Sequence, residues 1–532
     1  MVSTQAQAQA HLKTFHGIKL VFSTIAVSLA TFMFVLDYTI CNVALPYIAG
    51  GLASGVDQGT YVLTFFSVGN AVFLPITGWL ASRFGTIRTL LWAVILFTFF
   101  SALCGLATNL PILVVFRFFQ GAAAGPLVPL SQGALATIFP AKKLNVMMIV
   151  FSMIILIAPV LGPIVGGYLC IFYDWRWIFY INVPVGLFCA LVIWINMRQL
   201  DHSLKDSKVD YTSFFLLLIG MTVFQLFLDK GEQWNWFGSH KIQVSFSVFV
   251  IAISYLLARS LLLKRPLLKL DLFGKNKAFT LSCILIFTMY SIYMGTVVLV
   301  PLWLETYQGY NALWSGIAVS PIGLGSVITA PIMGRLIDKI GRMIPIVIGL
   351  LIMIWACLYA RNYYSEYSLQ QVMLSRFVLG LGVGCWVVPV ISMPAFALKQ
   401  ENMSEGLGVF HFIRVTSGAV GISIFTTLFK RRTIHQHFNL ASVFNEYTPQ
   451  AREYLHNIRQ LGVEKSQVNE IANRMTDIQA ASIAINEVSM LMVFLCIIML
   501  LFALSAIPWE QRLMRQLMQQ GVQNQTPQVL LE

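Results

Sequence analysis

The chain has 532 residues, of which 58% are hydrophobic and only 11% are charged. A soluble domain carries roughly 25% charged residues, so this composition excludes a soluble multidomain enzyme. The formal net charge is +13, but the basic residues lie in short segments between apolar blocks. We therefore interpret them as determinants of membrane topology rather than as a nucleic-acid surface.

Apolar blocks of about 20 residues, the length that crosses a hydrocarbon core, recur along the whole chain. The first block is long, contains Asp37 and lacks a cleavage site, so we expect a retained helix rather than a signal peptide. Fourteen spans are predicted, over 20–45, 58–81, 88–107, 111–136, 145–170, 177–197, 209–228, 243–263, 279–303, 311–335, 343–360, 370–396, 407–429 and 487–507.

Lysine and arginine are distributed unevenly between alternate loops. One set of loops holds Arg83, Arg88, Lys142, Lys143, Arg198, Lys205, Lys208, Lys264, Arg265, Lys269, Lys275, Lys277, Arg335, Lys339, Arg342 and Lys399, and the other holds Arg176, Lys230, Lys241 and Arg361. Because basic loops stay in the cytoplasm, both termini should be cytoplasmic in a bacterial inner membrane. The polar segment 430–486 then falls on the outer side, where its helical spacing predicts a small helical cap.

Two sequence motifs recur at nearly one offset, which indicates an internal repeat. GWLASRFGTIR (78–88) returns as GRLIDKIGRM (334–343), and RFFQGAAAG (117–125) returns as RFVLGLGVG (376–384). Because the second span pairs with the tenth, a six-helix repeat leaves two helices between its copies. We predict an all-α membrane fold with a six-helix bundle at 18–200, two inserted helices at 205–265, a second six-helix bundle at 275–507 and a cytoplasmic tail at 508–532.

Five segments resemble the major facilitator superfamily. The fourteen-helix layout is similar to the drug:proton antiporter branch of that superfamily, the EmrB/QacA subfamily. The resemblance extends from about residue 18 to 507. The five segments are LATFMFVLDYTICNVALP in the first span, GWLASRFG after the second, RFFQGAAAGPLVPLSQ in the fourth, APVLGPIVGG in the fifth and WRWIFYINVPVG before the sixth. This resemblance implies the major facilitator fold and transport by exchange (antiport).

The repeated loop motif departs from the family pattern at one position. Its residues here are Gly78, Arg83, Gly85 and Arg88 in the first copy, and Gly334, Arg335, Asp338, Gly341 and Arg342 in the second. The family usually has Asp where this chain has Ser82, whereas the second copy keeps Asp338. If the motif is a charge latch between the bundles, the latch rests mainly on Asp338, and simple positive-inside anchoring explains the basic residues equally well.

Two charged side chains lie inside predicted spans, where each costs a few kcal/mol and is expected to face a partner or a cavity. Desolvation favours the protonated form of a carboxyl group, so Asp37 in the first span suits a proton carrier. Arg117 in the fourth span could stabilise the carboxylate if it lies within roughly 6 Å. Structural roles, as a hydrogen-bonding aspartate and an arginine bonded to backbone carbonyls, are the alternatives. The resemblance implies proton coupling for both, with less weight on Arg376, the repeat counterpart of Arg117.

The fifth span carries Pro159, Gly162, Pro163, Gly166 and Gly167. Small residues at four-residue spacing permit close helix contact, and prolines remove backbone hydrogen bonds and kink a helix. The resemblance implies that this motif marks antiporters, which exchange rather than take up. Generic close packing of a membrane helix is the alternative.

A substrate cavity is predicted around Asp37, Tyr290, Tyr293, His411 and Arg414. His411 and Arg414 stand three residues apart and therefore share one helical face, although a purely structural polar pair is an alternative. The resemblance implies a role for Arg414. Phenylalanine and methionine are abundant in the chain, and adaptable apolar walls suit weakly specific binding.

We predict a proton-coupled secondary transporter that exports small, mostly apolar or amphipathic molecules by alternating access. The coupling proton is its only expected cofactor, and neither a metal nor nucleic acid is expected. No enzymatic motif is found at a convincing place, and the eight cysteines have no CxxC pair. A dedicated siderophore or metabolite transporter is the alternative; a membrane scaffold has no need of charges inside spans. The resemblance also implies a tripartite pump, with a periplasmic adaptor at 430–486 and an outer-membrane channel.

Overall fold

The computed structural model is a bundle of long helices, and no strand occurs in the part of the chain it describes. Fourteen helices in this part are long and apolar enough to cross a membrane, which confirms the predicted all-α membrane fold and its number of spans. The described residues are 15, 17–139, 144–200, 210–263, 266–361, 363, 367–398, 403–443, 449, 452–453, 460 and 465–525.

The first half of the chain forms six of these spans. The fourth is made of two helices that meet at Gly125 and Pro126, where proline removes a backbone donor. The helices of this half are α2 (Gly17–Gly51), α3 (Val56–Gly59), α4 (Tyr61–Phe84), α5 (Thr86–Gly105), α6 (Leu110–Ala124), α7 (Leu127–Ile138), α8 (Leu144–Phe172), α9 (Trp177–Tyr180) and α10 (Asn182–Met197), followed by the short η2 (Arg198–Leu200).

Two helices follow as a hairpin, α11 (Tyr211–Lys230) and α12 (His240–Leu262), with η3 (Trp236–Gly238) between them. Asp210 ties their ends together, because it caps α11 through Ser213 and accepts hydrogen bonds from Arg259 of α12 at 2.9 to 3.2 Å. At the other end of α11, Thr64 of α4 donates to Asp229 (2.5 Å). Ser423 of the second half donates to a backbone oxygen of α11. The hairpin therefore contacts both halves.

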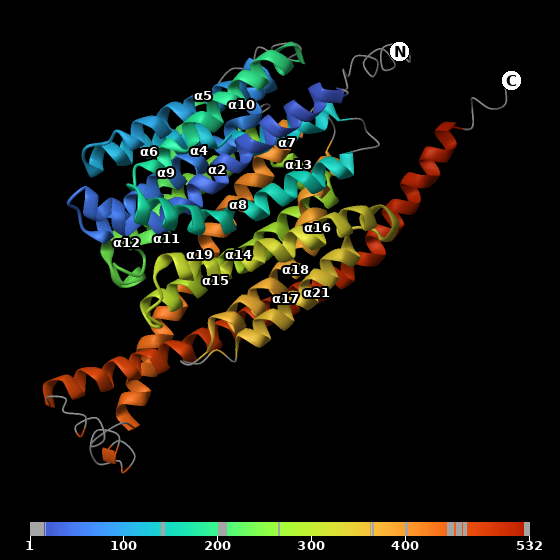
Figure 1. The fold of residues 1–532 in the computed structure, drawn as a ribbon. Helices are drawn as coiled ribbons and strands as arrows, with labels where there is room; N and C mark the ends of the chain where they lie inside the picture. The colour runs from blue at the N-terminus through green and yellow to red at the C-terminus, as the bar shows by residue number, and fades with distance from the viewer. Residues whose placement is uncertain are drawn as a thin grey trace.

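The second half supplies the remaining six spans. Its helices are α13 (Asp271–Lys275), α14 (Lys277–Thr306), α15 (Ala312–Val319), α16 (Pro321–Ile340), α17 (Met343–Ala360), α18 (Leu369–Ala397), α19 (Met403–Val443) and α21 (Lys465–Gln525). Figure 1 shows the first half in blue and cyan beside the second in yellow, orange and red, with both chain ends at the same end of the bundle.

The helices α19 and α21 are much longer than a membrane is thick. They have 41 and 61 residues, and about 20 residues span the hydrocarbon core. Figure 1 shows both helices running beyond the bundle at the end opposite the termini. The polar segment 430–486 is thus built largely of extensions of two spans, while residues 444–448 and 461–464 lie outside the described residues.

Equivalent glycines pack the two copies of the repeat in the same way. A Cβ on Gly121 of α6 would lie 2.1 Å from the backbone oxygen of Phe66 on α4, and one on Gly380 of α18 would lie 2.1 Å from that of Ile322 on α16. Only glycine lets these backbones approach so closely. Each pair is related by the offset found in the sequence, so Ile322 is the structural counterpart of Phe66.

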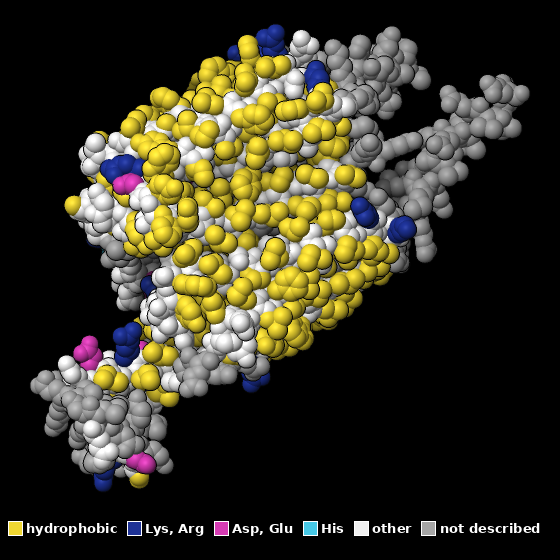
Figure 2. Space-filling view, in the orientation of Figure 1, with side chains coloured by type: hydrophobic (Ala, Val, Ile, Leu, Met, Phe, Trp, Pro, Cys, Tyr) yellow, Lys and Arg dark blue, Asp and Glu magenta, His cyan; other side chains and the backbone are white. Residues whose placement is uncertain are grey.

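The outer surface of the bundle is apolar, as a lipid-facing surface must be. Figure 2 shows hydrophobic side chains covering the central face, with most lysines and arginines near its ends. Large apolar side chains such as Trp92, Leu187, Ile251 and Leu262 are more than half exposed. Burial of these groups therefore requires the bilayer.

Candidate functional site

A buried ion pair joins α2 to α6. The Arg117 Nη1 atom lies 2.6 Å from the Asp37 Oδ2 atom, and both side chains are 0% exposed. The other carboxylate oxygen accepts from Asn182 at 2.8 Å and from Gln120 at 3.2 Å. Buried charges persist when they are paired and their remaining hydrogen-bonding positions are filled, and this carboxylate meets both conditions.

The arginine also contacts backbone and an aromatic ring. Its Nε atom donates to the Val62 backbone oxygen (3.4 Å), and its Cζ atom lies 4.0 Å from the centre of the Phe66 ring. Its Nη2 atom is buried without a hydrogen-bond partner. The two alternatives considered from the sequence, contact with Asp37 and contact with backbone carbonyls, therefore occur together, and the roles of both charges stay predictions.

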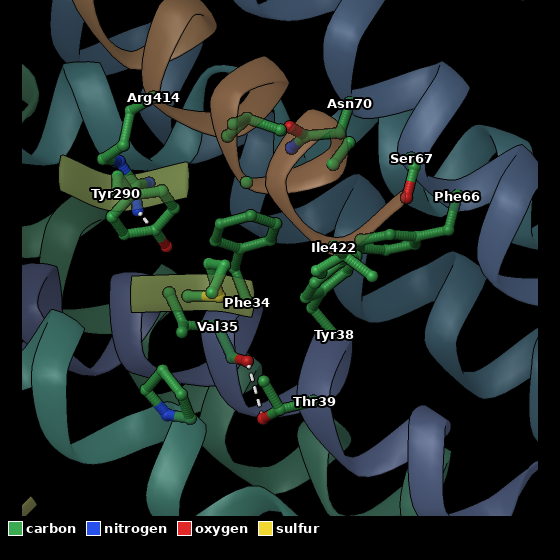
Figure 3. Close-up of a pocket in the computed structure, with 15 residues that line it drawn as sticks. Phe34, Val35, Tyr38, Thr39, Phe66, Ser67, Asn70, Tyr290, Arg414 and Ile422 are labelled. Atoms are coloured by element: carbon green, nitrogen blue, oxygen red, sulfur yellow. Dashed lines mark hydrogen bonds between the residues drawn. The ribbon is translucent and has the colours of Figure 1, made fainter. Parts of the chain in front are cut away.

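A small cavity of about 50 Å³ lies between the two halves. Figure 3 shows its wall, which is mostly apolar and aromatic, with Arg414 as the one charged side chain among the described lining residues. The lining comes from α2, α4 and α8 of the first half and from α14 and α19 of the second: Phe34, Val35, Tyr38, Thr39, Phe66, Ser67, Asn70, Pro159, Tyr290, Met294, Arg414, Val415, Gly418, Ala419 and Ile422.

A chain of polar contacts runs from Arg414 at the cavity, in the second half, to Gln132 of the first half. Arg414 donates from Nη1 to the Tyr290 hydroxyl (2.9 Å, dashed in Figure 3) and from Nε to His411 Nδ1 (3.2 Å). The His411 Nε2 atom lies 2.7 Å from Gln132 Oε1 on α7 of the first half. Gln132 donates in turn to the Ile391 backbone oxygen (3.3 Å). These contacts hold the halves together beside the cavity.

Of the five residues predicted for the cavity, Tyr290 and Arg414 line it. Asp37, Tyr293 and His411 are at most 1% exposed and are not among the lining residues. Asp37 faces α6 and α10, while the next residue, Tyr38, faces the cavity, because neighbouring helix positions point in different directions. Tyr293 packs beside Tyr290 with 5.8 Å between ring centres.

The proline and glycine motif of α8 forms close contacts on two sides. A Cβ on Gly162 would lie 2.1 Å from Thr39 Oγ1 of α2, and one on Gly166 would lie 3.1 Å from the Ile40 backbone oxygen. Gly167 approaches Leu313 of the second half, and Pro163 approaches Gly316. Pro159 lines the cavity. The motif therefore packs α8 against both halves, and its link to exchange stays a prediction.

The repeated loop motif is mostly helical. Gly85 alone interrupts the first copy, and Gly341 and Arg342 interrupt the second. Gly85 has φ 94° and Gly341 has φ 80°, values that favour glycine. Gly78 packs against Glu405 of the second half, and Gly334 packs against Ile149 of the first. Each copy thus contacts the opposite half.

The charged residues of this motif differ in their exposure. Arg335 is exposed and Arg83 is half-buried, while the Asp338 side chain lies outside the described residues. The N-terminal end of α17 follows Gly341. There, the backbone amides of Arg342 and Met343 donate to Glu510 (2.8 and 2.9 Å). The charge latch at Asp338 therefore stays a prediction.

The repeat counterpart of Arg117 has different surroundings. Arg376 is 2% exposed and donates to the Tyr363 hydroxyl and to Ser375, both at 3.4 Å. No carboxylate is among its recorded partners in the described chain, and Ile322 takes the place of Phe66. Within the described residues, the combination of acid, arginine and ring is therefore recorded in the first half alone.

Several polar residues of the site were not predicted as site residues. Asn182 and Ser101 extend the network around Asp37, with 3.0 Å between Asn182 Nδ2 and Ser101 Oγ. Asn70 lines the cavity with both side-chain polar atoms buried and unpartnered. A single amide inside an apolar span is the signal that could have singled out Asn70 and Asn182. Among the described residues, no group of acidic, histidine and cysteine side chains could hold a metal.

The sequence is similar to those of known proteins over most of its length. The family profile described as Major Facilitator Superfamily matches residues 27–422. The chain is 38% identical to the multidrug export protein EmrB of Escherichia coli K12 over 479 residues, which cover 90% of this chain and 93% of the relative. It is 35% identical to the fatty acid resistance protein FarB of Neisseria gonorrhoeae, over 89% of this chain and 93% of the relative.

Solved structures share the fold at low sequence identity. The peptide transporter POT in complex with sulfate has a TM-score of 0.59 at 14% identity, covering 92% of this chain and 95% of the other. The proton:xylose symporter XylE has a TM-score of 0.57 at 13% identity, covering 90% and 95%. These likenesses support the arrangement of helices.

Proposed function

This chain belongs to the major facilitator superfamily, and from that membership we propose that it is a proton-coupled exporter of small, mostly apolar or amphipathic molecules. Relatives named as multidrug export proteins align over nine-tenths of the chain. The observation that carries the mechanism is the buried Asp37–Arg117 pair, which stands beside a cavity between the two halves. Alternating access requires these elements, a central binding cavity and a site for the coupling ion.

The cavity wall supports a class of substrate. Its aromatic and aliphatic side chains can adapt to different apolar bodies, while Arg414 and the open amide of Asn70 offer polar contacts. A cation in an apolar cavity favours ligands with an anionic group. We therefore propose amphipathic molecules with an acidic head among the substrates, which agrees with the fatty acids named for one relative.

Proton coupling would proceed through the ion pair. Substrate binds from the cytoplasm or the inner leaflet while Asp37 is deprotonated and paired with Arg117. Protonation from the outside neutralises the carboxylate and weakens its attraction for the guanidinium, and the substrate is released outside. Loss of the proton to the cytoplasm restores the pair, and the halves return. No resident cofactor takes part in this scheme.

Replacement of Asp37 tests the proposal. Asp37→Asn keeps the size of the side chain and removes its titratable charge, and its amide replaces one acceptor oxygen with a donor. Reconstituted in liposomes, this variant should lose efflux driven by a pH gradient, assayed with an alkyl naphthalene sulfonate whose charge does not titrate near neutral pH. The matched control is Asp174→Asn, an exposed carboxylate away from the pair, which should transport normally. Unchanged efflux by Asp37→Asn rejects the assignment.

We also propose a location and partners. The excess of basic residues on one set of loops supports a bacterial inner membrane with both termini in the cytoplasm. The extensions of α19 and α21 would then face the periplasm and offer a contact for an adaptor protein that leads to an outer-membrane channel. Deleting this extension should abolish co-purification of such an adaptor, and retained co-purification would contradict the contact.

A further inference from the structure

Phe66 of α4 lies between the buried ion pair and the cavity. The Arg117 guanidinium covers its ring at 4.0 Å, and the same side chain lines the cavity. Its exposed fraction is 0%. Arg117 also donates to the backbone oxygen of Val62, one turn earlier on the same helix. A movement of the guanidinium therefore acts on this part of α4 through both the ring and the backbone.

Two further rings complete the wall. Phe34 stacks on Phe66 with ring centres 6.2 Å apart, and Tyr38 lies at 6.0 Å from it. Figure 3 shows these three side chains together at the cavity. Asp37 is 1% exposed and lies outside the lining. Proton and substrate therefore do not compete for direct contact with the carboxylate in this arrangement, and any coupling has to pass through the wall.

The second half provides an internal comparison. Ile322 occupies the place of Phe66, since a Cβ added to the equivalent glycine, Gly121 or Gly380, would lie 2.1 Å from the backbone oxygen of each. The buried Arg376, the counterpart of Arg117, donates to two hydroxyl groups, and no carboxylate is recorded as its partner among the described residues. The half in which the arginine is paired with a carboxylate is thus also the half in which it covers an aromatic ring, as expected if ring and carboxylate act together.

We propose that Phe66 is a positioning residue that transmits the protonation state of Asp37 to the wall of the substrate cavity. The proposal rests on the proton-coupling role of Asp37. While Asp37 is charged, its 2.6 Å contact holds the guanidinium over the ring. Protonation removes that attraction. The guanidinium, whose Nη2 atom already lacks a partner, then reorients, and the ring moves with it.

The surroundings of Asp37 contain one opposing charge, Arg117. Gln120 and Asn182, which contact the carboxylate from α6 and α10, do not titrate. The other titratable groups that interact electrostatically with Arg117 are the thiols of Cys41 on α2 and Cys104 on α5 and the phenol of Tyr38. A change in the charge of Asp37 is therefore felt first by Arg117.

The test separates transport from its coupling to protons. Phe66→Leu removes the ring and keeps an apolar side chain, whereas Phe66→Tyr keeps the ring. Phe65→Leu is the matched control, because Phe65 is the neighbour of Phe66 on α4 but is neither among the residues that line the cavity nor among the rings in contact with Arg117. Full-length proteins in liposomes are compared in two assays with the alkyl naphthalene sulfonate: exchange at equal pH, and efflux driven by a pH gradient.

We expect Phe66→Leu to retain exchange while losing gradient-driven efflux by at least about tenfold, the scale of a moderate coupling free energy. Phe66→Tyr and Phe65→Leu should keep the wild-type ratio of the two rates. A wild-type ratio in Phe66→Leu overturns the proposal, and so does an equal loss of both rates, which indicates a merely structural role.

A measurement without ligand covers the case in which the probe is not transported. Spin labels at Leu106→Cys, directly after α5, and at Trp314→Cys on α15, both well exposed, report the distance between the halves at about pH 6 and about pH 8. The wild type should change with pH, whereas Phe66→Leu should not. A change that persists in Phe66→Leu contradicts this role, while a change that persists in Asp37→Asn contradicts the proposed proton site instead.

Discussion

Arg414 places a positive charge on an otherwise uncharged cavity wall. Because it also donates to Tyr290 and His411, its fork-shaped guanidinium is held in one orientation. Arg414→Gln should lower transport of an alkyl sulfonate about tenfold relative to a size-matched quaternary ammonium compound. Arg414→Lys keeps the charge and should retain part of the preference. Paired efflux assays give the ratio, and an equal loss for both probes would argue for a structural role only.

At the scale of single residues, the sequence predicts which side chains are unusual better than where they point. Asp37 and Arg117 stand out because charges inside spans are costly, and the structure brings them into contact. Whether a side chain faces a cavity depends on helix rotation and on side chains from other helices. Phe66 illustrates this, since it is one of 39 phenylalanines and is distinguished by its place between Arg117 and the cavity.

Close contact between α4 and α6 depends on Gly121, where an added Cβ would lie 2.1 Å from a backbone oxygen. Gly121→Ala should therefore destabilise the protein by about 1–3 kcal/mol, as overpacking does. Gly133→Ala in α7 is the matched control, because no other atom lies within 4 Å of its added Cβ and alanine favours the helix. Thermal unfolding in detergent measures both, and equal melting temperatures would show that the helices separate at little cost.

The α11–α12 hairpin should be sensitive to acid. Burial tends to raise the pKa of Asp210, but hydrogen bonds from Arg259 and Ser213 outweigh this effect, and the pKa lies below its ordinary value. The folded pKa is thus lower than the unfolded one, so the stabilisation is present above about pH 4 and is lost as the pH falls through the folded pKa. Asp210→Asn should melt earlier than the wild type at neutral pH and equally in strong acid. A difference independent of pH would implicate capping alone.

At the scale of helices, hydropathy predicted the number of spans and most of their centres but not their ends. The loop motifs continue α4 to Phe84 and α16 to Ile340, because their polar residues are compatible with a helix outside the apolar core. The expected cap at 430–486 is likewise formed largely by extensions of α19 and α21. An apolar pattern reports contact with lipid, and a helix that continues into water lacks this signal.

The whole molecule has one end at which the halves are in contact across several helices. Gly334 of α16 meets Ile149 of α8, Gly78 of α4 meets Glu405 of α19, and Gly408 of α19 approaches the Leu74 backbone oxygen. Gly78 and Gly334 lie near the C-terminal ends of α4 and α16, and Ile149, Glu405 and Gly408 lie near the N-terminal ends of α8 and α19. The sequence repeat predicts in outline that each half presents one copy of the loop motif at this end. It does not predict the residues that the copies contact, because these lie in segments without a repeated motif.

Transport by rocking requires these contacts to break in every cycle. A Cβ on Gly334 would lie 3.5 Å from the Ile149 Cβ, within the range for a disulfide. Oxidised Gly334→Cys/Ile149→Cys should stop transport, and a reductant should restore it. The control, Gly220→Cys/Ala252→Cys, joins α11 to α12 at a similar Cβ separation of 3.4 Å and should leave transport intact. Transport that survives complete cross-linking between the halves would exclude rocking about this interface, because the contact could then remain closed while substrate crosses.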